Sequence, residues 1–333
     1  MNKKIEIGLI GYGNWAKDAY VPSIIECPDV LIKAVAAPSK TTRQLAQQKF
    51  PEATVFDSYN ALLDTSGVDA VMIGVPSNLV STVAISAIQA DKHIWIEPPA
   101  PGDQQVTSML ELAEKSTRVF HTDLELRYTP ALTAIKNLLE SKCLGSLLSI
   151  KISLKSNWTT TWANDAPELG KIVSGLSIWY LDVADFLIEQ SANRVDVFGV
   201  DHEHGNGISI GIGLLQYKDA IAQWAFDLRH QEELGLTLEI LTTNGEITAD
   251  LVTGKYRYRF ELENWIKLQA QPSRPILGFA GIRESSLTFI DAIKGNVQTK
   301  TGPAVLRRLH STITSFDHSI HRNDSSKINL QIQ

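Results

Sequence analysis

Short apolar runs and longer amphipathic stretches alternate along residues 1–120. The short runs predict strands at 5–10, 30–36, 54–56, 69–75, 93–97 and 118–121. Between them, apolar residues recur at helical spacing and predict helices near 15–26, 41–49, 58–65, 79–90 and 103–116. The run from Val68 to Val75 is almost wholly apolar, which suits a strand buried on both faces. This alternation predicts an α/β fold, a Rossmann-type doubly wound parallel sheet.

The pattern changes after residue 122. A helix is expected near 130–142, a strand at 146–157 and a helix near 175–190. Strands then dominate, at 194–201, 207–217, 220–229, 236–242 and 246–252, with a hairpin turn at Thr243-Asn244-Gly245. Helices near 283–295 and 303–320 precede a polar tail from Asn323. We therefore expect two domains: a dinucleotide-binding domain at 1–122, and an α/β domain at 123–333 whose open, mainly antiparallel sheet has helices on one face.

A glycine turn follows the first predicted strand, in the sequence Gly11-Tyr12-Gly13-Asn14-Trp15-Ala16. Gly11 can take the tight turn, Gly13 leaves room for phosphates, and Ala16 is small enough for the helix to pack on the strand. The strand before it and the helix after it are the context that a dinucleotide site needs. The alternative is a glycine turn that binds nothing. Trp15 could cover the cofactor or only fix the helix.

The carboxyl edge of the predicted sheet carries further candidates. Pro76 and Asn78 follow the fourth strand and Glu97 ends the fifth, so all three are expected beside the cofactor. Glu97 could otherwise bond to backbone and fix its turn.

The end of the second strand indicates which cofactor is preferred. An acidic residue there would hold the ribose 2′-hydroxyl of NAD(H), but this chain has Ala37. Ser39, Lys40 and Arg43 could instead receive a 2′-phosphate, which favours NADP(H) and leaves NAD(H) possible. Alternatively, Lys40 and Arg43 belong to a solvated helix start with Ser39 or Thr41 as its N-cap.

Composition narrows the class of protein. The 333 residues are 44% hydrophobic and 20% charged, with a net charge of −6, as in ordinary globular proteins. No basic block or long apolar run occurs, so neither nucleic acid nor a membrane is an expected partner. Cys27 and Cys143 lack metal-type spacing, and no metal site is expected. His202 and His204 could ligate a metal, but they are expected in a loop with Gly205 and Gly207, and no metal site is expected there. Residues 1–4 lead directly into the first predicted strand without a signal-peptide pattern, and we expect a cytoplasmic protein.

Several motifs together resemble the Gfo/Idh/MocA oxidoreductase family. They are the glycine turn, 68–73, Val75-Pro76-Ser77-Asn78, the run from Lys92 to Glu97, Arg127-Tyr128-Thr129-Pro130 and Leu144-Gly145. The resemblance covers nearly the whole chain. It implies a Rossmann domain binding NAD(H) or NADP(H), hydride transfer to a small-molecule substrate, and a homodimer or homotetramer formed through the carboxy-terminal sheet.

Three groups of the family's usual proton-transfer set are absent. Its Glu-Lys-Pro motif reads Glu97-Pro98-Pro99 here, so proline replaces the lysine. Aligned on Asp182, Gly175 replaces the family's aspartate and Trp179 its histidine. A positioned base contributes about 10²–10⁴-fold to alcohol oxidation, so the usual polyol mechanism is not expected. A conjugated acceptor mainly needs to be held near the nicotinamide. Biliverdin reductases, which resemble the family, also lack the motif lysine.

Candidate catalytic residues remain despite these losses. Glu97, Asp182, Arg127 and Trp179 are our candidates, and Lys155 is a further one. His121, Asp123 and Glu125 would share one face of an extended segment, although an exposed polar linker is the alternative for His121 and Asp123. Asp182 could equally pair with an arginine. Trp158, Trp162, Trp179 and Tyr180 suit a flat or apolar ligand, or else core packing.

Two functions from different classes follow. One is an NAD(P)-dependent oxidoreductase with atypical acid–base groups, acting on a small cyclic or conjugated molecule. The other is a non-catalytic protein that senses a dinucleotide or ligand. Yeast galactose-pathway repressors, which resemble this family, work by binding.

Overall fold

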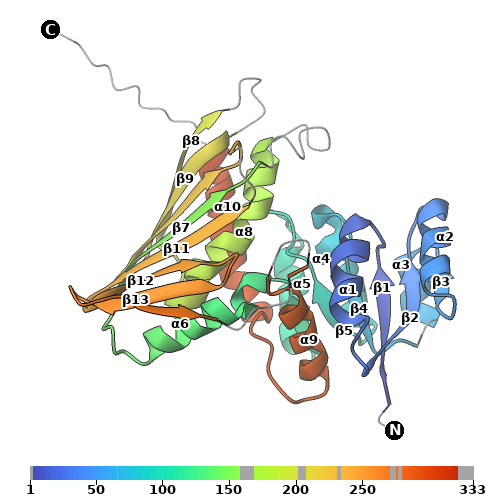
Figure 1. Ribbon diagram of the computed structural model, residues 1–333. Helices are drawn as coiled ribbons and strands as arrows, with labels where there is room; N and C mark the ends of the chain where they lie inside the picture. The colour runs from blue at the N-terminus through green and yellow to red at the C-terminus, as the bar shows by residue number, and fades with distance from the viewer. Residues whose placement is uncertain are drawn as a thin grey trace.

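The computed structural model describes residues 3–65, 67–157, 169–201, 208–230, 234–270, 275–276 and 280–321. In this part of the chain the two expected sheets lie side by side, the first at the amino-terminal end of the colour scale (Figure 1).

The first sheet is parallel and has six strands in the order β3-β2-β1-β4-β5-β6. Its strands are β1 (Ile5–Ile10), β2 (Val30–Ala36), β3 (Thr54–Phe56), β4 (Ala70–Ile73), β5 (His93–Ile96) and β6 (Phe120–Thr122). Its helices are η1 (Ala16–Tyr20), α1 (Val21–Ile24), α2 (Lys40–Lys49), α3 (Tyr59–Thr65), η2 (Ser77–Leu79), α4 (Val80–Gln89) and α5 (Val106–Lys115). The order changes direction between β1 and β4, which places the glycine turn at the switch point of the sheet.

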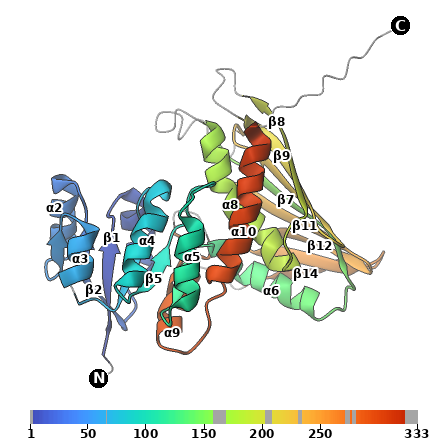
Figure 2. The same cartoon turned by 180° about the vertical axis from the view of Figure 1, so that it is seen from behind.

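The second sheet has eight strands in the order β14-β13-β12-β11-β7-β10-β9-β8. They are β7 (Leu147–Lys155), β8 (Arg194–Asp201), β9 (Ile208–Gln216), β10 (Ile221–Asp227), β11 (Gly235–Thr242), β12 (Gly245–Asp250), β13 (Lys255–Phe260) and β14 (Ile266–Gln269). Only β7 and β10 pair in parallel. Helices α8 (Leu169–Ile188) and α10 (Pro303–His321) cover one face, seen from both sides in Figures 1 and 2. The expected open, mainly antiparallel sheet is confirmed.

Several element boundaries differ from the prediction. The hairpin is confirmed, with Thr242 paired to Gly245 around a two-residue turn. Helix α8 begins at Leu169 rather than near 175, because the apolar periodicity alone does not mark its start. Strands β13 and β14 were not predicted. Their sequences, Lys255–Phe260 and Ile266–Gln269, alternate charged with apolar residues at the sheet edge and carry a weak apolar signal.

Helix α9 (Ile282–Ile293) returns from the second sheet to the first. Its residues Ile282, Phe289 and Ile290 join one hydrophobic core with β1 and with Trp95 of β5, on the face of the first sheet that α1 and α2 also cover. A second core runs from the opposite face, under α3, α4 and α5, into the second sheet. Helices η3 (Glu125–Tyr128) and α6 (Pro130–Glu140) connect the sheets. The boundary at 122/123 stays a prediction, since α9 crosses it.

No helix in the described residues is long and apolar enough to span a membrane.

Candidate functional site

The glycine turn is tight at one glycine and open at the other. Gly11 has φ +90°, and a Cβ there would lie 2.2 Å from the carbonyl oxygen of Gly74, so only glycine fits. Its N–H donates to the carbonyl of Ala36 at 2.9 Å. A Cβ on Gly13 would meet no described atom within 4 Å. The turn therefore leaves space at Gly13, where a phosphate needs to approach the backbone.

The helix after the turn begins as a π-helix, Ala16–Tyr20, and Ala16 is buried against the sheet as predicted. Asn14 is exposed and its Oδ1 accepts from Lys17 Nζ at 2.9 Å. Trp15 is 40% exposed, and its Nε1 donates to Glu97 Oε1 at 3.1 Å. The Tyr20 hydroxyl donates to the same oxygen. This helix therefore brings two donors from the glycine turn to the end of β5.

The candidates for 2′-phosphate binding lie together at the end of β2. Ser39 Oγ accepts from Thr42 N at 3.4 Å and caps α2. Arg43 Nη1 donates to the carbonyls of Ala37 and Pro38, at 2.9 and 2.7 Å. Lys40 is exposed at the first position of the helix. The N-cap role of Ser39 is confirmed, and the arrangement leaves the Lys40 ammonium in solvent at the same end of β2.

Glu97 is half-buried directly after β5. Burial raises the pKa of its carboxyl from 4.5 to about 7, although the hydrogen bonds from Tyr20 and Trp15 oppose the rise. Pro76 and Asn78 are exposed at the end of β4. The structure thus brings Glu97 together with Trp15, and it adds Tyr20, which the sequence did not single out.

Two more carboxyl groups lie near Glu97. Asp123 and Glu125 are buried, as is His121, so the exposed-linker alternative is wrong for both His121 and Asp123. Burial and the charge of Glu97 raise the pKa of Asp123, and burial and the charge of Asp123 raise that of Glu125. Ser285 Oγ donates to Asp123 Oδ1 at 2.7 Å. Glu125 Oε2 is buried without a hydrogen-bond partner among the described residues. The three carboxyls form an acidic cluster at the carboxyl edge of the sheet.

Arg127 and Asp182 belong to a buried ion cluster instead. Arg127 Nε lies 2.8 Å from both carboxylate oxygens of Asp182, and Nη2 donates to Asp185 Oδ2 at 2.6 Å. Arg308 also binds Asp185, at 2.5 and 2.7 Å. Burial raises the pKa of Asp182 to about 6 despite Arg127. The predicted alternative of a structural arginine partner for Asp182 is confirmed, and the cluster joins η3, α8 and α10.

The positions where the family pattern breaks lie directly after β5 and on α8. Pro98 is buried, and Trp179 is half-buried on α8 with its Nε1 donating to the Asp123 carbonyl at 3.0 Å. A Cβ on Gly175, the position that the resemblance aligns with an aspartate, would meet no described atom within 4 Å. Tyr180 stacks on Trp224 at 4.3 Å and is core. Lys155 is exposed, and Trp158, Trp162, His202 and His204 lie outside the described residues.

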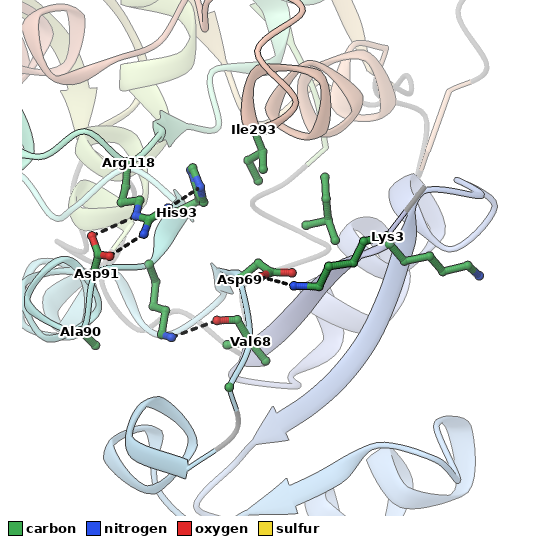
Figure 3. A pocket seen from close by; sticks show the side chains of 12 residues that line it. Lys3, Val68, Asp69, Ala90, Asp91, His93, Arg118 and Ile293 are labelled. Carbon is green, nitrogen blue, oxygen red and sulfur yellow. Dashed lines mark hydrogen bonds and ion pairs between the residues drawn. The ribbon is translucent and has the colours of Figure 1, made fainter. Parts of the chain in front are cut away.

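A hollow of about 430 Å³ lies at the opposite, amino-terminal edge of the first sheet (Figure 3). Its polar groups are largely paired with one another. Lys3 binds Asp69 at 3.2 Å and Lys92 donates to the Val68 carbonyl at 2.9 Å. Arg118 holds both oxygens of Asp91. This hollow is far along the strands from the glycine turn, and its internal pairing gives no reason to place the cofactor there. Among the described residues, no three His, Cys, Asp or Glu side chains are arranged so that they could hold a metal ion.

Comparison with known proteins identifies relatives of this chain. Residues 5–124 match the model of the Gfo/Idh/MocA oxidoreductase family with its NAD-binding Rossmann fold. A dTDP-3,4-didehydro-2,6-dideoxy-alpha-D-glucose 3-reductase of Streptomyces violaceoruber is 26% identical over 254 residues, covering 74% of this chain and 73% of its own. An inositol 2-dehydrogenase of Corynebacterium glutamicum is 24% identical over 155 residues, 45% of each chain.

Solved structures share the whole fold. An Agrobacterium radiobacter oxidoreductase in complex with NAD⁺, L-tartaric acid and magnesium superposes with a TM-score of 0.82, at 18% identity and over 96% of this chain and 97% of its own. A levoglucosan dehydrogenase in complex with NADH and levoglucosan superposes with a TM-score of 0.81. It is 17% identical, and the superposition covers 96% of this chain and 98% of its own. The expected resemblance to the Gfo/Idh/MocA oxidoreductase family is therefore confirmed over residues 5–124, the part of the chain that matches the family's NAD-binding Rossmann fold.

Proposed function

We propose that the protein is an NAD(P)-dependent oxidoreductase that transfers hydride to or from a small cyclic or conjugated molecule, with Glu97 as the proton-transfer group. The observation that carries this proposal is the placement of Glu97. It lies half-buried after β5 and is hydrogen-bonded by Trp15 of the glycine turn. A proton-transfer group beside the reacting ring of the cofactor is what the lost lysine would otherwise supply.

The residues of the turn fit a dinucleotide. The open space at Gly13 admits a pyrophosphate, and Trp15 is exposed beside it. The bound nicotinamide would supply or accept the hydride. Gly11, Gly13, Asn14 and Ala16 would hold the pyrophosphate end, while Pro76, Asn78 and Trp15 would border the path toward Glu97.

Glu97 can serve in either direction of the reaction. A carboxyl whose pKa is about 7 is protonated in a large fraction of molecules at neutral pH and ionised in the rest. The neutral form can donate a proton to the oxygen of a carbonyl that accepts hydride. The ionised form, held by Tyr20 and Trp15, can accept the proton of an alcohol that loses hydride.

The names of the relatives favour a cyclic substrate. The matching proteins are named for a deoxyglucose, an inositol and levoglucosan. The half-buried Trp179 provides an aromatic surface on the side of α8 that faces Asp123. An aromatic wall beside a carboxyl group suits a ring that stacks and carries an exchangeable hydroxyl or carbonyl.

For the cofactor we propose NADP(H), with NAD(H) as the second choice. Ala37 leaves no carboxylate for a ribose 2′-hydroxyl, and Lys40 is exposed at the end of β2. The Arg43 guanidinium lies against the carbonyls of Ala37 and Pro38 at the same place. Two cations there favour a 2′-phosphate.

We also propose that a second copy of the chain covers the outer face of the second sheet. Phe198 and Val200 are 59% and 65% exposed on β8. Ile210 of β9, paired with Val200, is 42% exposed. Three neighbouring apolar side chains on one face indicate an interface, and the resemblance implies a homodimer or homotetramer formed there.

The proposal is tested by titrating the protein with NADPH and NADH and then screening cyclic ketones, cyclic polyols and conjugated acceptors for a change in nicotinamide absorbance. Glu97→Gln should keep cofactor affinity within about twofold and lower the turnover rate by about 10²-fold or more. Glu111→Gln, on the exposed face of α5, is the matched control and should leave the turnover rate unchanged.

Two outcomes would count against the proposal. Failure to bind either nucleotide would exclude both the enzyme and the dinucleotide sensor. Tight binding without turnover of any compound would favour the non-catalytic sensor, to which the absence of ionisable groups at Pro98, Gly175 and Trp179 also points.

A further inference from the structure

A continuous file of hydrogen bonds connects Asp123 to the loop before α10. Asp123 Oδ1 lies 2.7 Å from Ser285 Oγ, which lies 3.0 Å from His121 Nε2. His121 Nδ1 in turn lies 2.8 Å from Thr299 Oγ1. The four side chains come from β6 and its end, from α9 and from the loop after α9. Folding alone does not require this polar arrangement, since apolar side chains of similar size could fill this core.

The chemistry of the groups fixes the direction of the file when Asp123 is ionised. A carboxylate can only accept, so Ser285 donates to it. The Ser285 oxygen then accepts from His121 Nε2–H, which leaves Nδ1 to accept from the Thr299 hydroxyl. The Thr299 oxygen accepts from the Thr301 N–H at 3.2 Å. Every hydroxyl and ring proton of the file therefore points toward Asp123.

His121 can pass a proton without becoming charged. It is fully buried, between the rings of Tyr128 and Phe289 at 5.5 and 5.8 Å. This burial lowers the pKa of its ring to about 3. The imidazole is therefore neutral at ordinary pH, and a proton can cross it only if one nitrogen gains a proton as the other loses one. The outer end, Thr299, is half-buried and follows the exposed residues Val297 and Gln298.

We propose that Thr299, His121 and Ser285 form a proton relay that joins Asp123, and through it the other carboxyls of the acidic cluster, Glu97 and Glu125, to solvent. The inference rests on the proposed function, because it supplies the proton that accompanies hydride transfer. The three relay residues act through Asp123 and are positioning residues.

In the direction of reduction, each proton of the relay moves one position toward Asp123. The substrate carbon gains the hydride and its two electrons from the reduced nicotinamide, and the substrate oxygen takes a proton from the acidic cluster. The Asp123 carboxylate then takes the Ser285 proton, Ser285 takes the proton of His121 Nε2, and His121 Nδ1 takes the proton of Thr299. A solvent proton restores Thr299. After one inward transfer His121 carries its proton on Nδ1, and the Ser285 and Thr299 hydroxyls point away from Asp123. The ring must return to Nε2–H and both hydroxyls must turn back before the next proton passes inward.

Four ionisable groups face Asp123 and influence when it titrates. Glu97 comes from the end of β5, Glu125 from η3, Tyr20 from η1 and His121 from β6. The negative charges of Glu97 and Glu125 favour the protonated form of Asp123. We therefore expect the relay to change state at a pH above the ordinary range of an aspartic acid.

The relay is tested without any substrate by nitrogen NMR of protein labelled with ¹⁵N-histidine. His121 is assigned by the resonances lost in His121→Gln. As pH rises through the titration of the acidic cluster, the neutral His121 ring should change from Nδ1–H to Nε2–H. A His121 ring that keeps one tautomer while Asp123 titrates would overturn the proposal, because the Asp123 proton would then lie outside the file.

Ser285→Ala and Ser286→Ala provide a matched pair on α9. Ser285→Ala breaks the file and should abolish the pH-dependent change of tautomer. Ser286 is equally buried and bonds Ser23 Oγ at 2.8 Å instead, so Ser286→Ala should keep the change. A change of tautomer that survives in Ser285→Ala would contradict the relay. Circular dichroism and the melting temperature of both variants show whether either loss comes from unfolding.

A kinetic measurement separates this inference from the proposed function. With any compound that the screen identifies, Ser285→Ala and Thr299→Val should lower the rate of reduction at least tenfold and leave the KM of the cofactor within about twofold. The NMR test of the relay does not depend on this kinetic measurement. Loss of cofactor binding in the wild-type protein would defeat the proposed function, whereas a fixed tautomer would defeat the relay alone.

Discussion

Gly11 and Gly13 occupy one turn but meet different requirements. Gly11→Ala would force a Cβ into the Gly74 carbonyl at a left-handed backbone angle, so we expect a lower melting temperature, with a cost of more than about 1 kcal/mol. Gly13→Ala places its Cβ in open space and should leave the melting temperature unchanged. If the phosphate approaches there, the same substitution should lower the affinity for NADPH at least tenfold. Isothermal titration calorimetry measures this affinity. An unchanged affinity would exclude a pyrophosphate at Gly13.

Glu97 should make stability depend on pH. Its carboxyl has a pKa of about 7 in the folded protein and 4.5 ordinarily, so the folded state binds more protons between these values. The free energy of unfolding must therefore fall as pH rises from 4.5 to 7, by about 3 kcal/mol. In urea denaturation across this pH range, the free energy of unfolding of Glu97→Gln should decrease less than that of the wild-type protein. Parallel curves for the two proteins would show that the folded-state pKa is not raised.

Lys40 tests the choice of cofactor. Lys40→Ala removes a cation at the end of β2. It should lower the affinity for NADPH by about tenfold, as expected for one lysine–phosphate contact, and change the affinity for NADH little. Fluorescence titration of both nucleotides measures the difference. Equal weakening of the two would contradict a 2′-phosphate at Lys40, and the exposed Lys142→Ala serves as a control for net charge.

At the scale of single residues, the sequence predicted the members of the site better than their partners. Glycine spacing and strand ends identified Gly11, Gly13 and Glu97 because these depend on local backbone rules. Tyr20 and Ser285 were missed, since a tyrosine in an apolar helix and a serine on α9 carry no local sign of what they contact. His121 showed its polar character but not its burial, which is decided by α9 packing on β6 from more than a hundred residues away.

Among the elements, η3, α8 and α10 depend on the buried ion cluster around Arg127. Arg127→Met should leave the buried Asp182 carboxylate uncompensated and Asp185 with Arg308 alone. We expect a cost of about 3–5 kcal/mol in the free energy of unfolding. Arg118→Met breaks an exposed pair with Asp91 and should have little effect. Urea denaturation of both variants makes the comparison. A small effect in both would show that the cluster is not needed for the helices to pack.

The first sheet was easier to predict than the second for a physical reason. Parallel strands buried on both faces, such as β4, are uninterrupted apolar runs, so their positions can be read from the chain. Edge strands such as β14 are exposed along their whole length, and their polarity resembles that of a loop. The helix after the glycine turn was predicted, but its π geometry was not. That geometry depends on the backbone hydrogen-bond pattern, which no side chain in the segment indicates.

For the whole molecule, the outer face of the second sheet makes a prediction about assembly. Phe198→Glu places a charge in the exposed apolar group of β8 and β9 and should reduce the mass measured by light scattering after size exclusion. Leu262→Glu, 93% exposed in a turn, should keep the wild-type mass. A wild-type protein that is already monomeric, or an assembled Phe198→Glu protein, would exclude this face as the interface.

The return of α9 to the first sheet has a consequence for synthesis. The ribosome releases β1 to β6 long before Phe289 and Ile290, which complete the core on one face of that sheet. At about 5–20 residues per second, roughly 10–40 s separate Trp95 from Phe289. During that interval the nascent first domain must wait with this apolar face incompletely covered, so it is the stage of biogenesis most exposed to aggregation and to chaperone binding.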